Sequence, residues 1–135
     1  MDKEELRARG REMRRKLAGD ICADRLDQTV YNDPHMAKFG DVTQEILFAQ
    51  LWPRPGLDLK TRTLVTMTCD VATGQTEALS MHLRFCRNHG WSEDEIVECI
   101  IQAMAYVGVP MTRKAIMTAS QVFAEMAANG EMARD

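Results

Sequence analysis

Apolar side chains recur every three to four residues along most of the chain, which is the period of an amphipathic α-helix. No segment shows the strict alternation of apolar and polar residues that marks a half-buried β-strand. Glycines and prolines interrupt this helical pattern. The pattern and its interruptions together predict six helices, over residues 3–18, 34–51, 60–73, 77–89, 93–107 and 111–127. We therefore expect an all-α fold, a single-domain bundle of about six helices that spans residues 1–135.

Residues typical of helix ends set these boundaries. Asp33 followed by Pro34 is a typical helix start, and Ser92 with Glu95 has the spacing of a capping box. We also expect Thr76 to cap the fourth helix. Residues 1–33 are interpreted as an N-terminal helix plus the polar connector 20–33, and residues 128–135 as a tail that frays.

Two joints between the predicted helices have different lengths. The segment WPRPGLD, residues 52–58, contains two prolines and a glycine and is predicted to be a loop. Gly74 leaves only a tight turn between the third and fourth helices, which favours an αα-hairpin.

Composition narrows the function. The net charge of −3 favours neither nucleic acid nor an anionic membrane as partner, whereas an anionic small molecule can still bind a local arginine cluster. The charged N-terminus is unlike a signal peptide, and no apolar run is long enough to span a membrane. The four cysteines form neither a CxxC pair nor a zinc-like spacing with histidine: Cys22, Cys69, Cys86 and Cys99. We expect a cytoplasmic protein with reduced thiols, no metal and no cofactor.

The fourth predicted helix contains a histidine within its apolar face. In EALSMHLRFC, His82 shares a face with Leu79, Leu83 and Cys86, so its ring points inward or into a cleft. Glu77 lies about 140° away around the helix, which makes it a poor intrahelical partner. Two interpretations remain open here: a core histidine with a satisfied hydrogen bond, and a general acid/base.

Several motifs resemble one known family. The motifs RPGLDLKTRTLVTMT and, after a glycine, EALSMHLRFCRNHGWSEDEIVECIIQAMAYVGVP are similar to the carboxymuconolactone decarboxylase family, a branch of the alkylhydroperoxidase D-like superfamily. The short, stand-alone γ-carboxymuconolactone decarboxylases are the most similar group. The resemblance implies an all-helical alkylhydroperoxidase D-like fold, trimers or hexamers, and active sites near subunit contacts. It also implies cofactor-free conversion of 4-carboxymuconolactone to 3-oxoadipate enol-lactone, a step of protocatechuate degradation.

The chain departs from the superfamily pattern at defined positions. The peroxidase branch uses a CxxC pair and a relay glutamate, and Gln75, Ala78 and Thr63 stand at those positions here. Related decarboxylases often have two acids before the histidine, of which Glu77 is kept and the second is Ala78. A related enzyme of aromatic or secondary metabolism with another substrate is therefore an alternative.

The resemblance and the residues together indicate a set of site residues. We expect His82 to act as general acid/base and oxyanion partner, and Glu77 to orient a histidine or arginine in another helix or subunit. Arg62 and Arg54 are candidates to bind substrate carboxylates, since a guanidinium binds them bidentately. The structural alternatives are a cap network of Arg62 with Asp58 and a surface role for Arg54.

Two aromatic residues and two further functions complete the hypotheses. Trp52 and Tyr106 are expected to line the pocket, with core packing as the alternative for Trp52.

One alternative function is a thiol-dependent peroxidase or redox protein that uses Cys69 or Cys86. The other is a non-catalytic oligomeric binding module.

Overall fold

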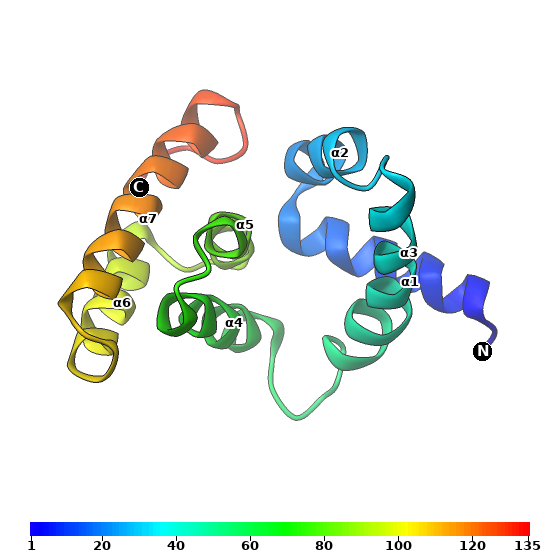
Figure 1. Cartoon of the computed structure of the whole chain (residues 1–135), viewed down its shortest axis with the longest axis horizontal. Helices are drawn as coiled ribbons and strands as arrows, with labels where there is room; N and C mark the ends of the chain where they lie inside the picture. Colours follow the sequence, from blue (N-terminus) through cyan, green and yellow to red (C-terminus); the bar gives the residue numbers. More distant parts are fainter. The chain divides into compact units, whose positions relative to one another are not determined.

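The structure, a computed structural model, describes residues 1–135 and contains helices without any strand (Figure 1). Its elements in chain order are α1 (Lys3–Ala18), α2 (Asp20–Thr29), α3 (Pro34–Val42), the π-helical segment η1 (Thr43–Leu51), α4 (Leu59–Thr73), α5 (Thr76–Asn88), α6 (Glu93–Val107) and α7 (Val109–Ala128). The predicted all-α class is confirmed. The chain forms two compact units, Met1–Leu59 and Lys60–Asp135, and each is described by itself. The single domain remains a prediction.

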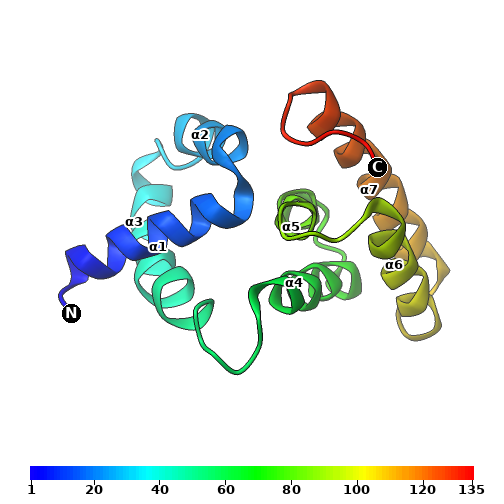
Figure 2. The ribbon, with the colours of Figure 1, turned by 180° about the vertical axis from the view of Figure 1, so that it is seen from behind.

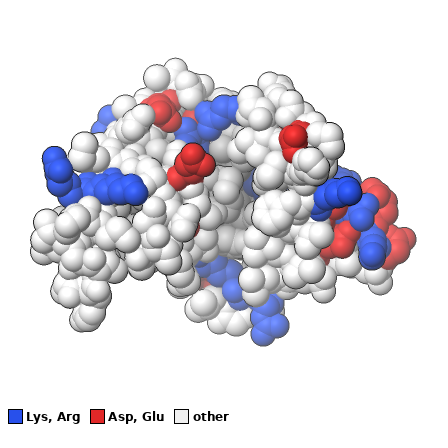
Figure 3. Space-filling model, viewed as in Figure 1, with Lys and Arg blue, Asp and Glu red and all other residues white.

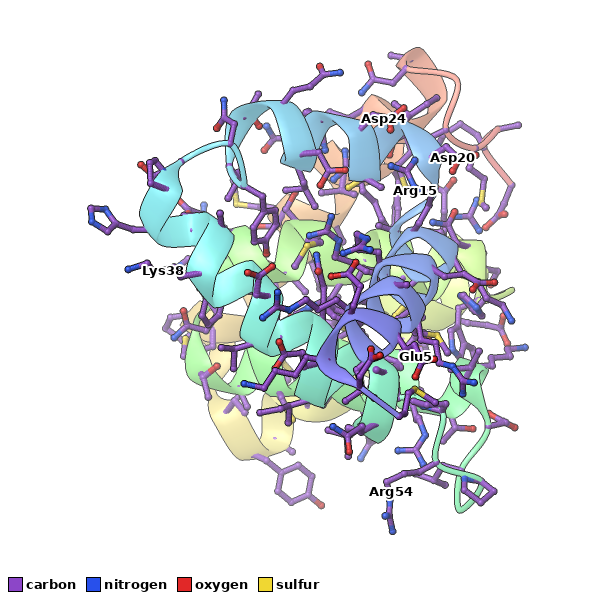
Figure 4. The ribbon with its side chains drawn as sticks, turned by 90° about the vertical axis from the view of Figure 1, so that its right-hand side faces the viewer. Glu5, Arg15, Asp20, Asp24, Lys38 and Arg54 are labelled. Carbon is purple, nitrogen blue, oxygen red and sulfur yellow. The ribbon has the colours of Figure 1, made fainter.

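The additional helix, α2, lies where a polar connector was predicted. Gly19 separates it from α1, and the glycine adopts a φ of 83° that other residues rarely accept. One face of α2 is apolar enough to bury Cys22 and Ala23. Acidic residues on the other face bind α1, since the guanidinium of Arg15 donates hydrogen bonds to the carboxylates of Asp20 and Asp24 (Figure 4). The prediction missed α2 because so short an apolar face is hard to distinguish from a polar turn.

The predicted helix 34–51 consists of two segments. Asp33 caps α3 as predicted, since its carboxylate accepts from the amides of His35 and Met36. From Thr43 the backbone widens into η1, where the Trp52 amide donates five residues back to the Leu47 carbonyl at 3.0 Å. Residues 52–58 then form the predicted loop.

The packing of α1 against η1 organises the N-terminal unit (Figure 2). Gly10 of α1 makes this close approach possible, because a Cβ there would lie 2.1 Å from the backbone oxygen of Gln44. Arg7 of α1 adds a hydrogen bond of 2.6 Å from its Nε to the carboxylate of Glu45.

In the C-terminal unit, α4 and α5 are joined by the short turn Gly74–Gln75, and α6 packs along α7 (Figures 1 and 2). The helices α4 and α5 do not lie side by side as the predicted αα-hairpin, since α4 runs across the view of Figure 1 and α5 is seen end-on. All four helices contribute to its core: Met67, Val71, Leu79, Leu83, Cys86, Ile96, Ile100, Ala115, Ala119, Val122, Phe123 and Met126. The predicted capping box of Ser92 and Glu95 starts α6. The predicted Thr76 cap is wrong: Gln75 occupies the N-cap position, and no side chain caps α5.

The segment after α7, for which we expected fraying, has specific partners in the structure. Gly130, with a φ of 74°, turns the chain, and the amides of Glu131 and Met132 both donate to the Met126 carbonyl. Ion pairs to α5 and α6 then hold the segment against the C-terminal unit. These contacts give the last residues a defined path.

The surface is electrostatically mixed. Charges of both signs are interspersed on the face shown in Figure 3, and much of that face is uncharged. Each helix is too short or too polar to cross a lipid bilayer.

None of the four cysteines forms a disulfide, and their surroundings differ. Cys86 is fully buried, and its Sγ donates to the Thr63 carbonyl at 3.3 Å. Desolvation by burial raises the pKa of this thiol to about 12, despite the hydrogen bond to Thr63, which lowers it. Cys22 is also buried, Cys99 is half-buried, and Cys69 is exposed. Cys86 therefore stays protonated at neutral pH and cannot react as a thiolate.

Gly10→Ala should destabilise the protein. Alanine favours a helix over glycine by about 1 kcal/mol, but the clash with the Gln44 backbone cannot be relieved by a side-chain rotation. We expect a net loss of about 1–3 kcal/mol or more in the free energy of unfolding, measured by urea denaturation. Gly56→Ala is the control, since nothing lies within 4 Å of the added Cβ. A Gly10→Ala protein as stable as wild type would contradict the close packing of α1 on η1.

Thiol titration of the native protein with an aromatic disulfide reagent should separate the four cysteines. Cys69 should react first because it is exposed, and Cys22 and Cys86 should react only after unfolding. Cys69→Ser should remove the fast phase. Fast modification of Cys86 in the folded protein would show that its burial is wrong.

Candidate active site

A carboxylate of α4 and an imidazole of α5 meet between the two helices. Asp70 in the last turns of α4 and His82 in the middle of α5 form a hydrogen bond of 2.5 Å between Oδ2 and Nδ1. The two side chains are only 11% and 17% exposed, respectively. Asp70 and His82 are thus a partly buried, charge-assisted pair with limited access to water.

Packing on both helices explains how the pair is held. Asp70 stands between the core residues Met67 and Val71 on α4, and His82 follows Leu79 by one turn on α5. The edge of the His82 ring also packs against Phe85, with ring centroids 5.0 Å apart. The predicted inward-facing stripe of α5 is therefore present, and His82 lies at its margin.

This geometry selects the state of the imidazole. An ionised carboxylate only accepts hydrogen bonds, so Nδ1 carries the proton that it donates to Asp70. The ring makes no other hydrogen bond in the structure, which leaves Nε2 to exchange a proton with a bound molecule. Such a pair can donate or accept a proton at a fixed position.

A small pocket adjoins the Asp70 side of the pair. Its wall includes Asp70, the start of α5 at Gln75 and Thr76, and Lys114 of α7. The Lys114 ammonium lies 3.4 Å from the Gly74 carbonyl oxygen and so brings a positive charge to this pocket. The pocket therefore joins both signs of charge at the meeting point of three helices.

Arg62 shares one stripe of α4 with Asp70. Residues 62, 66 and 70 are spaced four apart, which places them along one side of the helix. Arg62 precedes Asp70 by about 12 Å along the axis and is half-buried. The structure therefore places Arg62 on the same side of α4 as Asp70, and its role toward a substrate remains a prediction.

Glu77 and Tyr106 belong to the same unit but are not hydrogen-bonded to the Asp70–His82 pair. Glu77 is exposed in the first turn of α5, where its charge suits the positive end of the helix dipole. Tyr106 lies near the end of α6 and is 83% exposed. Within one chain, the partner that orients His82 is Asp70. The role expected of Glu77, toward a histidine or arginine of another helix or subunit, remains a prediction.

Trp52 and Arg54 belong to the N-terminal unit. Trp52 is 5% exposed, which fits the packing role named as its alternative. Arg54 is exposed in the loop that follows η1, and its side chain extends away from the ribbon (Figure 4). Their roles toward a substrate remain predictions.

Asp70 is the site residue that the sequence analysis missed. It is the sole acidic residue between Asp58 and Glu77, in a helix that otherwise consists mostly of threonines and apolar residues. It also follows the apolar Met67 by three positions, on the same face. A lone acid on an apolar face, one helix before a lone histidine on an apolar face, is a signal that could have identified the pair.

The surroundings of Cys86 and Thr63 do not support the redox alternative. Cys86 is the cysteine on the His82 face, and burial keeps it protonated at neutral pH. Thr63, at the position of the peroxidase relay glutamate, is buried, and its hydroxyl donates to the Lys60 carbonyl. Neither residue can supply a reactive thiolate or relay a proton as the peroxidase pattern requires.

Comparisons with known proteins identify a family. The model of the carboxymuconolactone decarboxylase family matches residues 37–121. The 4-carboxymuconolactone decarboxylase of Acinetobacter baylyi is 32% identical over 93% of this chain and 92% of its own length. The nitrosuccinic acid decarboxylase of Metarhizium robertsii is 31% identical over 70% of this chain and 66% of its own.

The family match includes α4 and α5 with the Asp70–His82 pair, and both of these named relatives are decarboxylases. The resemblance found in the sequence is therefore confirmed. The chain belongs to the carboxymuconolactone decarboxylase family and is an enzyme of the carboxy-lyase class.

Proposed function

We propose that the protein is a cofactor-independent decarboxylase of a carboxylated unsaturated lactone, with 4-carboxymuconolactone as substrate and 3-oxoadipate enol-lactone as product. This places the protein in protocatechuate degradation, in the cytoplasm. The observation that carries the proposal is the Asp70–His82 hydrogen bond of 2.5 Å. The similarity to the Acinetobacter baylyi enzyme supports the substrate.

The reaction needs one proton at the right atom. When the carbon–carbon bond to the leaving carboxylate breaks, CO2 departs and its bonding electrons move into the conjugated lactone carbonyl. The oxyanion that forms must be stabilised, and a proton must then be added to carbon. His82 in its imidazolium form donates that proton from Nε2, while Asp70 keeps Nδ1 protonated and the ring in place.

Cations are needed for the carboxylates of this substrate. Arg62 is the candidate in the same unit as His82, because it follows the stripe of α4 that ends at Asp70. Lys114 adds a positive charge beside the Asp70 pocket. One carboxylate, held away from the reacting carbon, orients the molecule. The departing carboxylate must instead lose its solvation.

A second substrate is supported by the relative from Metarhizium robertsii, which is named for nitrosuccinic acid. In that molecule a nitro group next to the departing carboxylate accepts the electrons, as the conjugated carbonyl does in the lactone. The chemistry required of the protein is the same: hold a dicarboxylate, release CO2 and protonate carbon. The two candidates therefore share the role of His82 and differ in the shape of the pocket.

We also propose a homo-oligomer, a trimer or hexamer. Large apolar side chains are exposed from the end of α6 into α7: Ile101, Met104, Tyr106, Val109 and Met117. Apolar surface of this kind is usually covered by another chain. A second copy on this surface would also remove Tyr106 from water, as its predicted place in a pocket requires.

His82→Ala should lower kcat for CO2 release from 4-carboxymuconolactone by roughly 10²-fold or more, since the proton donor is lost. Asp70→Asn should also lower kcat, because an amide can donate to Nδ1 and so favour the wrong tautomer. His35→Ala is the control, as its side chain is 93% exposed. Full activity of His82→Ala would show that the histidine is structural. Turnover of nitrosuccinate alone would replace the lactone by the second substrate.

Sedimentation velocity should give the mass of three or six chains at micromolar concentration. Met117→Glu places a charge in the exposed apolar surface and should shift the distribution toward smaller species. Gln28→Glu, which adds the same charge at an exposed polar position of α2, should leave the assembly intact. A wild-type protein that sediments as a monomer would contradict the proposed oligomer.

A further inference from the structure

The segment after α7 holds the side of α5 that faces away from His82. We propose that Glu131 is a positioning residue for His82 and acts through Arg84, which its carboxylate binds. The inference deepens the proposed function and rests on it, since it assumes that His82 transfers the proton. The contacts of Arg84, the geometry of α5 and the path of the segment support it.

The guanidinium of Arg84 is enclosed by acceptors. The residue is 1% exposed, and its Nε donates to Oε1 of Glu131 at 2.9 Å, while Nη2 reaches Oε2 of Glu131 at 3.4 Å. Nη1 donates to the carbonyl and the hydroxyl of Ser80 at 3.0 and 3.2 Å. Glu131 is itself only 5% exposed. Neither partner can leave without stranding a buried charge.

Glu125 of α7 provides a built-in comparison. Its Oε2 lies 3.3 Å from Nη2 of the same arginine, but its side chain is 45% exposed. Water can therefore replace Glu125, whereas it has little access to Glu131. Arg84 depends on the segment after α7 more than on α7 itself.

His82 and Arg84 point to different sides of α5. Two residues correspond to a rotation of about 200° around a helix, so the two side chains lie on opposite faces. Asp70 of α4 holds α5 on one face, and Glu131 holds it on the other. A rotation or shift of α5 toward either side would break one of these two contacts.

The rest of the segment keeps Glu131 in place. Arg87 of α5 binds the Asp135 carboxylate at 2.9 Å and the Ala133 carbonyl at 3.2 Å. Arg134 binds the Glu93 carboxylate at the start of α6 with both Nε and Nη2. Met132 packs against the core of the unit. The segment is therefore attached to α5, α6 and the core at once. These attachments fix the position of the Glu131 carboxylate that binds Arg84.

The test compares Glu131→Gln with Glu125→Gln, two equal charge removals beside one arginine. In protein labelled with 15N histidine, we expect Glu131→Gln to shift the His82 ring signals and to weaken the low-field Nδ1 proton of the bond to Asp70. We expect its kcat to fall about 10-fold or more with KM within about twofold, since displacements near 1 Å have such effects. Glu125→Gln should match wild type in both readouts.

The proposal is overturned if Glu131→Gln lowers the melting temperature but leaves the His82 signals and kcat at their wild-type values. If Glu131→Gln does not fold, Glu131→Asp keeps the charge and shortens the reach by one methylene, and the same criteria apply to it. The NMR readout needs no substrate. A wild-type protein inactive on 4-carboxymuconolactone and nitrosuccinate would thus remove the proposed function, while the effect of Glu131 on His82 would still be decided.

Discussion

The hydrogen bond between Asp70 and His82 is the interaction on which the functional interpretation depends. It joins α4 to α5, which are connected by a turn of only two residues, and it fixes the tautomer of a partly buried imidazole. One helical fold can host many different reactions, so the reaction of this protein must be argued from its site. Here one carboxylate gives a single histidine the orientation that proton transfer to carbon requires.

Local signals made much of the fold predictable. Asp33 with Pro34 and Ser92 with Glu95 start helices as expected, because capping depends on residues within one turn. The π-helical segment η1 and the close approach at Gly10 were not predictable, since both depend on backbone packing between distant segments. The helix α2 was missed because only Cys22 and Ala23 are buried on it.

The site was predictable in the same uneven way. Helical periodicity placed His82 at an inward face, and the structure agrees, with Leu79, Leu83 and Cys86 buried beside it. No partner for His82 was identified from the sequence, because Asp70 lies on the preceding helix and becomes its neighbour only in the folded chain. Arg84 could not be interpreted from its own helix, since its main partner, Glu131, lies 47 residues further along the chain.

The short turn between α4 and α5 has a consequence for how the protein folds. Asp70 and His82 are 12 positions apart in the sequence, so their contact closes a small loop and can form as soon as α4 and α5 have formed. The contact of Arg84 with Glu131 closes a much longer loop and must wait until α6 and α7 have docked. We expect the reactive pair to form early in folding and to become rigid only with the last segment of the chain.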